Sequence, residues 1–538
     1  MSLDRAGPGA ESRKVVTRVY PEFPATSRKV SPASMARAAP LVGLWIAVAV
    51  YYVFVISAGH FTRWHIWSGF YDAQAQALLE GHLYLSEAPS PALMALPNPY
   101  DIANMPFWRW DHSYYQGHLY LYWGLVPAFI AAGIKALFHP AGVPDNSLTF
   151  AFCIIRLIAG TLLIRDVARN AARRPPRWVV TLAMLVFALA NPTPYTLARA
   201  GIYEAAIMGG VAFMMAGLWF GYRAVISRTD GVTAAWLAAA SLSFGLAGGS
   251  RLSLIPTVAA LAVLTGLWCW RQPREGQASA SRRLFATAVA ALAPAGAIGI
   301  GLLICNKLRF GAWTEFGRSY VMTYPYFLPG VRFLLPDSYA YAFAPPQWTC
   351  TFPYLSSAWN ALRPSTPSWL PLTWPPDHHS PEPTIGLLTI APFIWLALLA
   401  ALAALWRARV QRASPDAPTS GFSWAAATAR RNWLWVALIV YVAGFGPFMI
   451  LNVTTMRYEH DFFSAVLLLA TFGAWRLLAT SSTPRARRTL SWLYAILAVT
   501  TIVAGVLLGF GGYFKHFERH NPALLHALQS ALNLCHQS

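Results

Sequence analysis

Long apolar runs are the feature of this sequence that most constrains its fold. The first occupies residues 41–58, and further runs begin near His118, Leu148, Trp178, Tyr203, Val232, Leu252, Leu284, Thr384, Trp433, Phe462 and Leu490. Most are close to the roughly 20 residues that an α-helix needs to cross a bilayer. Only 12% of the residues are charged, whereas soluble domains carry about a quarter. The sequence therefore predicts an all-α polytopic membrane protein with about 11–13 transmembrane helices.

Positive charge is concentrated in the links between the apolar runs. The formal net charge is +20, and the arginines gather in segments 13–37, 165–177, 271–283, 407–431 and 485–488. Arginine-rich links of this kind mark the cytoplasmic side of a membrane protein, whereas a nucleic-acid-binding protein gathers its basic residues on one surface. We therefore expect a multi-pass protein of the cytoplasmic (inner) membrane, with a cytoplasmic N-terminus and no nucleic-acid partner.

The same links leave one membrane crossing undecided. A cytoplasmic N-terminus places the loop after the first run outside, and the basic link 165–177 belongs inside. An odd number of crossings must lie between them, yet the runs 118–138 and 148–164 both occupy that interval. Either one of these two runs does not cross the membrane, or one basic link breaks the rule.

Two long loops divide the chain into parts. We expect a disordered basic tail over 1–37, an N-terminal transmembrane module over 38–305 with a first external loop at 59–117, a second external loop at 306–383, C-terminal transmembrane helices over 384–512 and a C-terminal tail over 513–538. The second loop is rich in Pro, Trp and Tyr, a composition that suits ordered turns better than a flexible linker. It is predicted to fold back over the outer face as a lid.

A short interfacial helix is predicted directly after the first run, in the sequence FYDAQAQALLEGHLYL over residues 70–85. Ser68 is suitably placed to cap its N-terminus, and Gly81 to end it. Asp72 stands in the first turn, where a carboxylate ordinarily complements the helix dipole. It has no basic neighbour within one helical turn and faces the space above the membrane. Asp72 is therefore a candidate for chemistry.

Other ionisable and polar residues lie at the ends of apolar runs, on the predicted outer side. They are Asp111, Arg199, Tyr203, Glu204, Arg251, Arg457, Tyr458, His460 and Asp461. Ionisable groups beside a span are costly to place, so each is a functional candidate by default. Arg251 stands alone where the topology rule gives no reason for an arginine. Arg457 and Asp461 also have the spacing of an ordinary i, i+4 helix pair.

Several common catalytic patterns are missing from the sequence. It contains no Gly-rich phosphate loop, nucleophile elbow or HExxH, which argues against an enzyme that uses soluble nucleotides. Its five cysteines form no CxxC and no zinc spacing. Adjacent acids and histidines occur at 377–379 and 459–461, but neighbours on a helix face different directions. No metal site or certain cofactor is predicted, and a divalent metal is not favoured. Arginines at a membrane surface instead suit a phosphate carried by a lipid.

Four segments resemble GT-C-type integral membrane glycosyltransferases, in particular bacterial members. The acid after the first run, followed by small residues and Leu up to Gly81, is similar to the juxtamembrane helix of that superfamily. DHSYYQGHLYLYWGLVP, which begins at Asp111, is similar to the Gly-x-x-Tyr-x-x-x-x-x-Pro segment that leads into the next helix. NKLRFGAWTEFG and MRYEHDFFSAVLLLA look like further recurring segments. Many members have two adjacent acids at the first position, where this chain has only Asp72, so a single base without a metal is the better expectation.

The resemblance implies an inverting glycosyltransferase. It would move a sugar from a polyprenyl-phosphate donor to an acceptor glycan, lipid or protein on the external or periplasmic face. Asp72 would be the general base and Asp111 a second acid near the reacting centre. The donor phosphate would be bound by Arg251, Arg457 and Arg199, and the substrates would be contacted by Tyr203, Glu204, Tyr458, His460 and Asp461.

Two other functions remain open. A transporter or flippase of a lipid-linked sugar would use the same outer charges without chemistry, and a membrane scaffold would use the long loops to dock a partner. A transporter should carry pathway acids or broken helices at mid-membrane in paired halves. The charges of this chain lie at the ends of its runs, which favours an enzyme.

Overall fold

The computed structural model describes residues 32–272, 279–323, 327–357, 366–412, 426–512 and 514–534. The chain divides into two compact units, residues 1–46 and 47–538. The described part of the first unit is the beginning of helix α1 (Pro32–Ile56), which starts inside the segment predicted to be a disordered tail. All other elements belong to the second unit.

Ten helices of the described chain are long and apolar enough to cross a membrane. They include α1, α5 (Asp145–Asn170), α6 (Arg177–Leu189), α8 (Ile202–Ile226), α9 (Asp230–Ser250), α10 (Ile255–Arg271), α11 (Ala280–Phe310), α15 (Ala426–Ala443), α16 (His460–Thr480) and α17 (Pro484–Gly511). The predicted all-α polytopic membrane fold is confirmed.

Shorter elements fill the connections. The short helices are α2 (Phe70–Leu79), α3 (Pro91–Met94), α4 (Val126–Phe138), α7 (Thr193–Leu197), α12 (Leu334–Phe343), α13 (Leu387–Ile390), α14 (Trp395–Arg412), α18 (His516–His520) and α19 (Pro522–Ala531). The strands are β1 (His112–Tyr115), β2 (His118–Tyr120), β3 (Val321–Met322), β4 (Gln347–Trp348) and β5 (Leu355–Ser356). Helix α11 continues to Phe310, so the second long loop begins later than residue 306.

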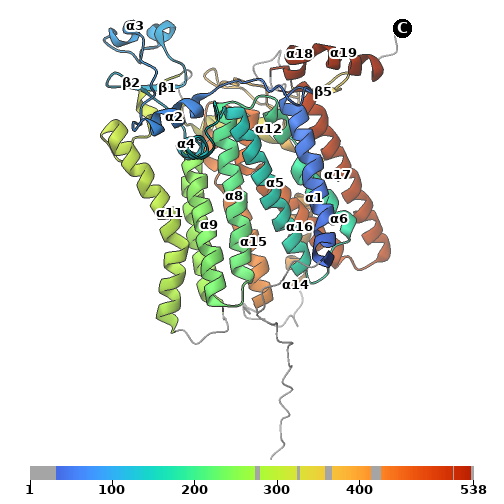
Figure 1. The fold of residues 1–538 in the computed structure, drawn as a ribbon. Helices are drawn as coiled ribbons and strands as arrows, with labels where there is room; N and C mark the ends of the chain where they lie inside the picture. The colour runs from blue at the N-terminus through green and yellow to red at the C-terminus, as the bar shows by residue number, and fades with distance from the viewer. Residues whose placement is uncertain are drawn as a thin grey trace, which may run out of the picture. The chain divides into compact units, whose positions relative to one another are not determined.

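A small sheet joins the two long loops. Strand β1 of the first loop pairs antiparallel with β2 and with β3 of the second loop, with His112 opposite Met322 and Ser113 opposite Val321. The two loops must therefore lie on the same side of the membrane. In Figure 1, β1, β2 and α2 lie at the same end of the long helices as α12, α18 and α19. We call this end the loop side.

The loop between α15 and α16 also belongs to the loop side. Its Leu451 and Val453 form β-bridges with Pro329 and His379 of the second loop. An even number of crossings must separate two segments on one side, so α14 has to cross together with α15. The 18 residues of α14 give a helix of about 27 Å, which is close to the hydrocarbon thickness. With α14, the described chain has eleven crossings.

Helix α4 resolves the crossing that the sequence left undecided. Its 13 residues give a length of only about 20 Å, and it packs against the interfacial helix α2. The run 118–138 is therefore the one that does not cross. With this assignment the basic links 165–177 and 485–488, together with Arg271, Arg282 and Arg283, fall at the opposite end of the helices, which we call the arginine side.

A buried arginine supports the end of helix α6. Pro192 prevents the helix from continuing and leaves the last carbonyl groups without helical partners. Arg156 of α5, which is fully buried, donates through Nη2 to the Phe187 carbonyl oxygen at 3.1 Å. The Tyr52 hydroxyl donates to the Ala188 carbonyl oxygen at 2.6 Å. A cation at a helix C-terminus also complements the helix dipole, which explains a charge inside the bundle.

The predicted interfacial helix exists, but its start is built differently. Gly69 occupies the N-cap position without a side-chain hydrogen bond, and Asp145 at the start of α5 accepts from the backbone N–H groups of Phe70 and Tyr71, both at 3.1 Å. Ser68 does not cap the helix, because its hydroxyl donates to Asp145 at 2.6 Å. Gly81 follows the helix with φ +91°, as the sequence predicts.

The assignment of residues to the loop side and the arginine side predicts which introduced cysteines react with a membrane-impermeant thiol reagent. Ser90→Cys and Thr349→Cys, both exposed on the loop side, should react in intact cells to the same extent. Ser482→Cys, exposed on the arginine side, should react only after permeabilisation. The parent chain is the control for its native cysteines. A difference in sidedness between positions 90 and 349 would contradict the pairing of β1 with β3.

Candidate active site

A cavity of about 860 Å³ opens on the loop side, between the ends of α8 and α9 and the two long loops. It is lined by Tyr122, Trp123, Gly124, Tyr203, Ala206, Ser250, Arg251, Leu252, Ser253, Thr314, Glu315, Phe316, Arg318, Ser319, Phe327, Phe448, Leu451 and Tyr458. Its size is within the range of small-molecule sites, and aromatic walls with a few convergent polar groups are typical of them. The second long loop supplies several of the lining residues.

Close backbone packing forms one wall of the cavity. A Cβ atom on Gly124 would lie 2.2 Å from the Gly249 carbonyl oxygen and 2.4 Å from the Ser250 carbonyl oxygen. Only glycine permits this approach. The Tyr71 hydroxyl donates to the Gly124 carbonyl oxygen at 3.1 Å, which ties the wall to α2. The wall fixes the end of α9 and therefore the direction of Arg251, the next residue.

Arg251 forms the buried charge pair of the cavity. Its Nη2 and Nε atoms donate to Asp461 Oδ2 at 2.8 and 3.2 Å. The guanidinium carbon also lies 5.1 Å from the Tyr458 ring centroid, a cation–π distance. Three residues that the sequence singled out therefore meet here. Asp461 pairs with Arg251 rather than with Arg457, because Arg457 precedes α16 in a 3₁₀ turn and does not share its face.

Asp111 belongs to a chain of hydrogen bonds in the cavity wall. The Tyr203 hydroxyl donates to Asp111 Oδ1 at 2.7 Å, and the Tyr122 and Tyr203 hydroxyl oxygens lie 3.2 Å apart. The Thr323 hydroxyl donates to the same carboxylate oxygen at 3.3 Å. Burial raises the pKa of Tyr122, and the nearby Asp111 raises it further, so this phenol stays protonated. Asp111 itself does not line the cavity, and the Tyr203 hydroxyl group connects its carboxylate to the cavity wall.

The backbone of Asp111 is fixed by the small sheet. Its φ is +60°, a left-handed conformation in which aspartate is enriched among non-glycine residues. Its N–H donates to the Met322 carbonyl oxygen at 3.0 Å, immediately before β1 pairs with β3. The contact between the two long loops thus sets the position of the carboxylate.

Arg457 lies behind this wall and does not line the cavity. Its guanidinium carbon is 4.3 Å from the Tyr203 ring centroid, and its nitrogen atoms are 3.7 Å from Glu204 and 3.8 Å from Glu382. Glu204 also accepts from the Gly201 N–H at 3.1 Å at the start of α8. Arg457 and Glu204 therefore support Tyr203 from behind.

Asp72 is not among the residues that line this cavity. Its Oδ1 atom accepts from Lys135 Nζ at 3.0 Å and from the Val143 N–H at 2.7 Å. Tyr71 bonds to the cavity wall, whereas Asp72, one residue further along α2, contacts α4 and the segment before α5. No basic residue lies within one turn of Asp72 on its own helix, but Lys135 of the neighbouring helix α4 pairs with it.

Two other predicted residues lie outside the cavity. Arg199 stacks on Phe514 and Trp67, with its guanidinium carbon 5.0 and 6.0 Å from their ring centroids. His460 is fully buried, and its Nε2 atom lies 2.8 Å from the Thr196 hydroxyl oxygen. Neither is among the residues that line the cavity.

The structure brings to the cavity two charged residues, Arg318 and Glu315, that the sequence offered as candidates without a role. Arg318 lines the cavity, lies 5.0 Å from the Phe327 ring centroid and makes no ion pair with any residue of the described ranges. Glu315 also lines it, but accepts from the Ser319 hydroxyl at 2.6 Å within its own loop. The signal for both was the charged segment NKLRFGAWTEFGRSY after a span. Across the residues described, no group of three or more His, Cys, Asp or Glu side chains could hold a metal ion.

Comparison with known proteins finds similarity in structure only. No family model and no curated protein matches the chain. The Archaeoglobus fulgidus oligosaccharyltransferase AglB, in complex with an inhibitory peptide and a dolichol-phosphate, is similar with a TM-score of 0.46 and 11% identity over 88% of this chain and 56% of that chain. ArnT from Cupriavidus metallidurans, bound to undecaprenyl phosphate, has a TM-score of 0.40 and 11% identity over 90% of this chain and 78% of that chain.

Both matches are similarities in structure at 11% sequence identity. This chain spans about half the length of the oligosaccharyltransferase that it matches. Because the TM-scores are below 0.5, no residue role is carried over from either structure, and the chemistry rests on the geometry of this cavity.

Proposed function

We propose that this protein is a membrane glycosyltransferase that moves a sugar from a polyprenyl-phosphate donor to an acceptor hydroxyl in the cavity on the loop side. The observation that carries the proposal is the convergence of arginines and a carboxylate on one cavity. Arg251 and Arg318 line it, and Asp111 is bonded to Tyr203 in its wall. These are the groups that transfer from a phosphate-linked sugar requires.

Arg318 and Arg251 are proposed to bind the phosphate of the donor. A guanidinium group matches the oxygen atoms of a phosphate and remains charged at physiological pH. Arg318 is available because no carboxylate in the described ranges pairs with it. Arg251 is held in place by Asp461 and contributes a fixed positive charge. As the bond to the sugar breaks, both residues stabilise the negative charge that develops on the departing phosphate.

Asp111 is proposed as the general base, acting through Tyr203. The oxygen atom of the acceptor hydroxyl forms a bond to the anomeric carbon, and the bond from that carbon to the phosphate oxygen breaks with its electron pair. The acceptor proton passes to the Tyr203 oxygen while the Tyr203 proton passes to Asp111, 2.7 Å away. The product is a glycosylated acceptor, and polyprenyl phosphate leaves. Attack from the face opposite the phosphate would invert the anomeric configuration.

The loop side is proposed to face the exterior, with the N-terminus in the cytoplasm. The basic links at the opposite end of the helices support this orientation through the positive-inside rule. Cys350, on the loop side, is joined in a disulfide, and disulfides persist in oxidising compartments outside the cytoplasm. The second external loop is proposed to act as a lid, since residues 314–319 form part of the cavity wall.

Binding of polyprenyl phosphate tests the proposed phosphate site. Arg318→Gln should weaken the affinity of the purified protein for polyprenyl phosphate by about 10-fold or more, because a charged hydrogen-bond partner of the phosphate is lost. Arg63→Gln removes the same charge from an exposed position on the loop side and should leave the affinity within about twofold. Equal affinities of the Arg318→Gln variant and the parent would contradict the site.

Donor binding and sugar transfer together separate the enzyme from a transporter. The protein would be incubated with a panel of polyprenyl-phosphate sugars and an acceptor. An enzyme should transfer the sugar of one of these donors to the acceptor and release polyprenyl phosphate. A transporter or flippase should bind the same lipid and move it across a liposome membrane with the sugar still attached.

A further inference from the structure

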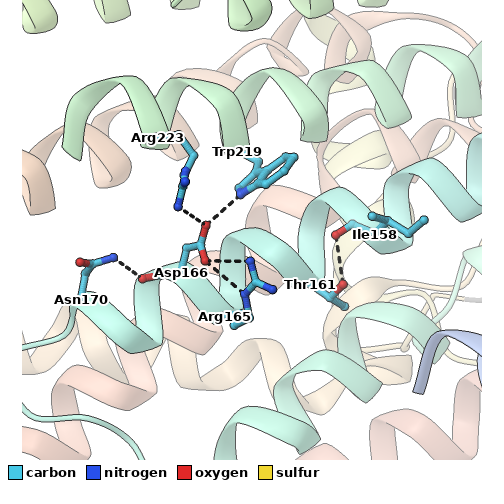
Figure 2. Close-up of polar contacts among 7 residues, drawn as sticks. All are labelled: Ile158, Thr161, Arg165, Asp166, Asn170, Trp219 and Arg223. Carbon is cyan, nitrogen blue, oxygen red and sulfur yellow. Dashed lines mark hydrogen bonds and ion pairs between the residues drawn. The ribbon is translucent and has the colours of Figure 1, made fainter. Parts of the chain in front are cut away.

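A second cluster of charges lies on the arginine side, at the opposite end of α8 from Tyr203. Figure 2 shows Asp166 of α5 between Arg165 of the same helix and Trp219 and Arg223 of α8. Its Oδ1 atom accepts from Arg165 Nε and Nη2 at 3.2 and 3.1 Å. Its Oδ2 atom accepts from Trp219 Nε1 at 3.1 Å and from Arg223 Nη1 at 3.5 Å. Both carboxylate oxygens of this buried residue are therefore in use.

The cluster carries more positive than negative charge. Two guanidinium groups share the single carboxylate of Asp166, whose side chain is 4% exposed, whereas Arg165 and Arg223 are 29% and 38% exposed. Nη1 of Arg165 and Nε and Nη2 of Arg223 make no hydrogen bond to any residue that the structure describes. One positive charge and several N–H donors therefore point outward from the ends of two adjacent helices.

An aromatic pair lies beside the Arg223 guanidinium group. The Arg223 guanidinium carbon lies 5.0 Å from the Trp236 ring centroid, and Trp219 and Trp236 are 6.2 Å apart. Tryptophan is enriched where lipid head groups begin. Because Asp166 holds both arginine side chains and Trp236 packs against Arg223, a ligand would not have to order them on binding.

We propose that Arg165 and Arg223 bind the phosphate group of an anionic phospholipid in the leaflet on the arginine side. The phosphate carries a negative charge that offsets the excess positive charge of the cluster. Its oxygen atoms can accept hydrogen bonds from the unused N–H donors of the two guanidinium groups. Basic pockets between helix ends on the cytoplasmic side bind anionic head groups in this way. The bound lipid would bridge α5 and α8, the second of which carries Tyr203 at its other end.

Thermal unfolding and native mass spectrometry of the full chain in a neutral detergent test this site. Added phosphatidylglycerol should raise the Tm and remain bound, whereas phosphatidylcholine should do neither. Arg223→Gln and Arg165→Gln should each weaken phosphatidylglycerol retention by about 10-fold. Arg487→Gln, which removes the same charge from an exposed position on the same side, should retain it like the parent. Inorganic phosphate alone should not raise the Tm if the ligand is a membrane lipid.

Asp166→Asn separates a built site from general attraction between charges. Removing a negative charge would strengthen binding if only net charge mattered, but it should weaken phosphatidylglycerol retention if Asp166 positions the arginines. If this variant does not fold, Arg223→Gln decides the question. Equal retention by the Arg223→Gln, Arg487→Gln and parent proteins, or an equal response to phosphatidylcholine, would overturn the proposal.

Discussion

Asp111→Asn should lower the rate of sugar transfer at least about 100-fold, the low end of the contribution of a positioned general base. Asparagine keeps the size of the side chain, and its carbonyl oxygen can still accept a hydrogen bond from the Tyr203 hydroxyl. In the parent protein that hydroxyl lies 2.7 Å from Asp111 Oδ1. Asparagine cannot accept the proton. The free energy of unfolding should therefore change by no more than about 1 kcal/mol, and the affinity for polyprenyl phosphate should stay within about twofold.

Two further variants identify the path of the proton. Tyr203→Phe removes the hydroxyl group between the cavity and Asp111 and should also slow transfer by about 10-fold or more. Asp72→Asn breaks a partly exposed pair with Lys135, which is worth about 0–1 kcal/mol, and should leave the rate within about 10-fold of the parent. An inactive Asp72→Asn protein beside an active Asp111→Asn protein would reverse the assignment and restore the role that the sequence resemblance gives to Asp72.

Gly124→Ala should lower the rate of sugar transfer by a comparably large factor, because it displaces the backbone of the cavity wall. The added Cβ would lie 2.2 Å from the Gly249 carbonyl oxygen, so the end of α9 must move. Overpacking of this kind costs about 1–3 kcal/mol. The shift would displace Arg251 and the cavity wall, and a displacement near 1 Å can lower a rate by about 100-fold. Transfer rates and thermal unfolding measure the two effects together.

Gly133→Ala is the matched control for this variant. Gly133 lies in α4, and a Cβ atom there meets no other atom within 4 Å. Alanine is favoured over glycine inside a helix, so this variant should be at least as stable as the parent and equally active. Normal activity of Gly124→Ala would show that the wall is not needed for catalysis.

The sequence predicted the membrane spans well because the length and apolar character of a span are local properties. Run length and the position of arginines indicated the spans and their ends, but left open whether one of the runs 118–138 and 148–164 does not cross or one basic link breaks the rule. The decision between these two needed the structure, because α4 is apolar enough to resemble a span. What sets it apart is its 13 residues and its packing against α2, which no local pattern shows.

The site was predicted less completely because its contacts join distant parts of the chain. Arg251 and Asp461 were both singled out, but their pairing across 210 residues was not. The sequence favours Asp72 because no basic residue lies near it on its helix, whereas in the structure Lys135, 63 residues away, pairs with it. The link from Asp111 to Tyr203 spans 92 residues. Such contacts depend on the tertiary fold, which brings loop residues together at helix ends.

Photo-crosslinking of the donor lipid tests the central claim, that the cavity on the loop side is the transfer site. A polyprenyl phosphate with a photoreactive group near its phosphate would be added to the protein in liposomes, irradiated, and located by peptide mapping. We expect labelling within residues 314–319 or 448–458, which contribute to the cavity wall, with competition by unmodified polyprenyl phosphate and weaker labelling of Arg318→Gln. Competed labelling confined to α2 and α4, around Asp72 and Lys135, would contradict the account.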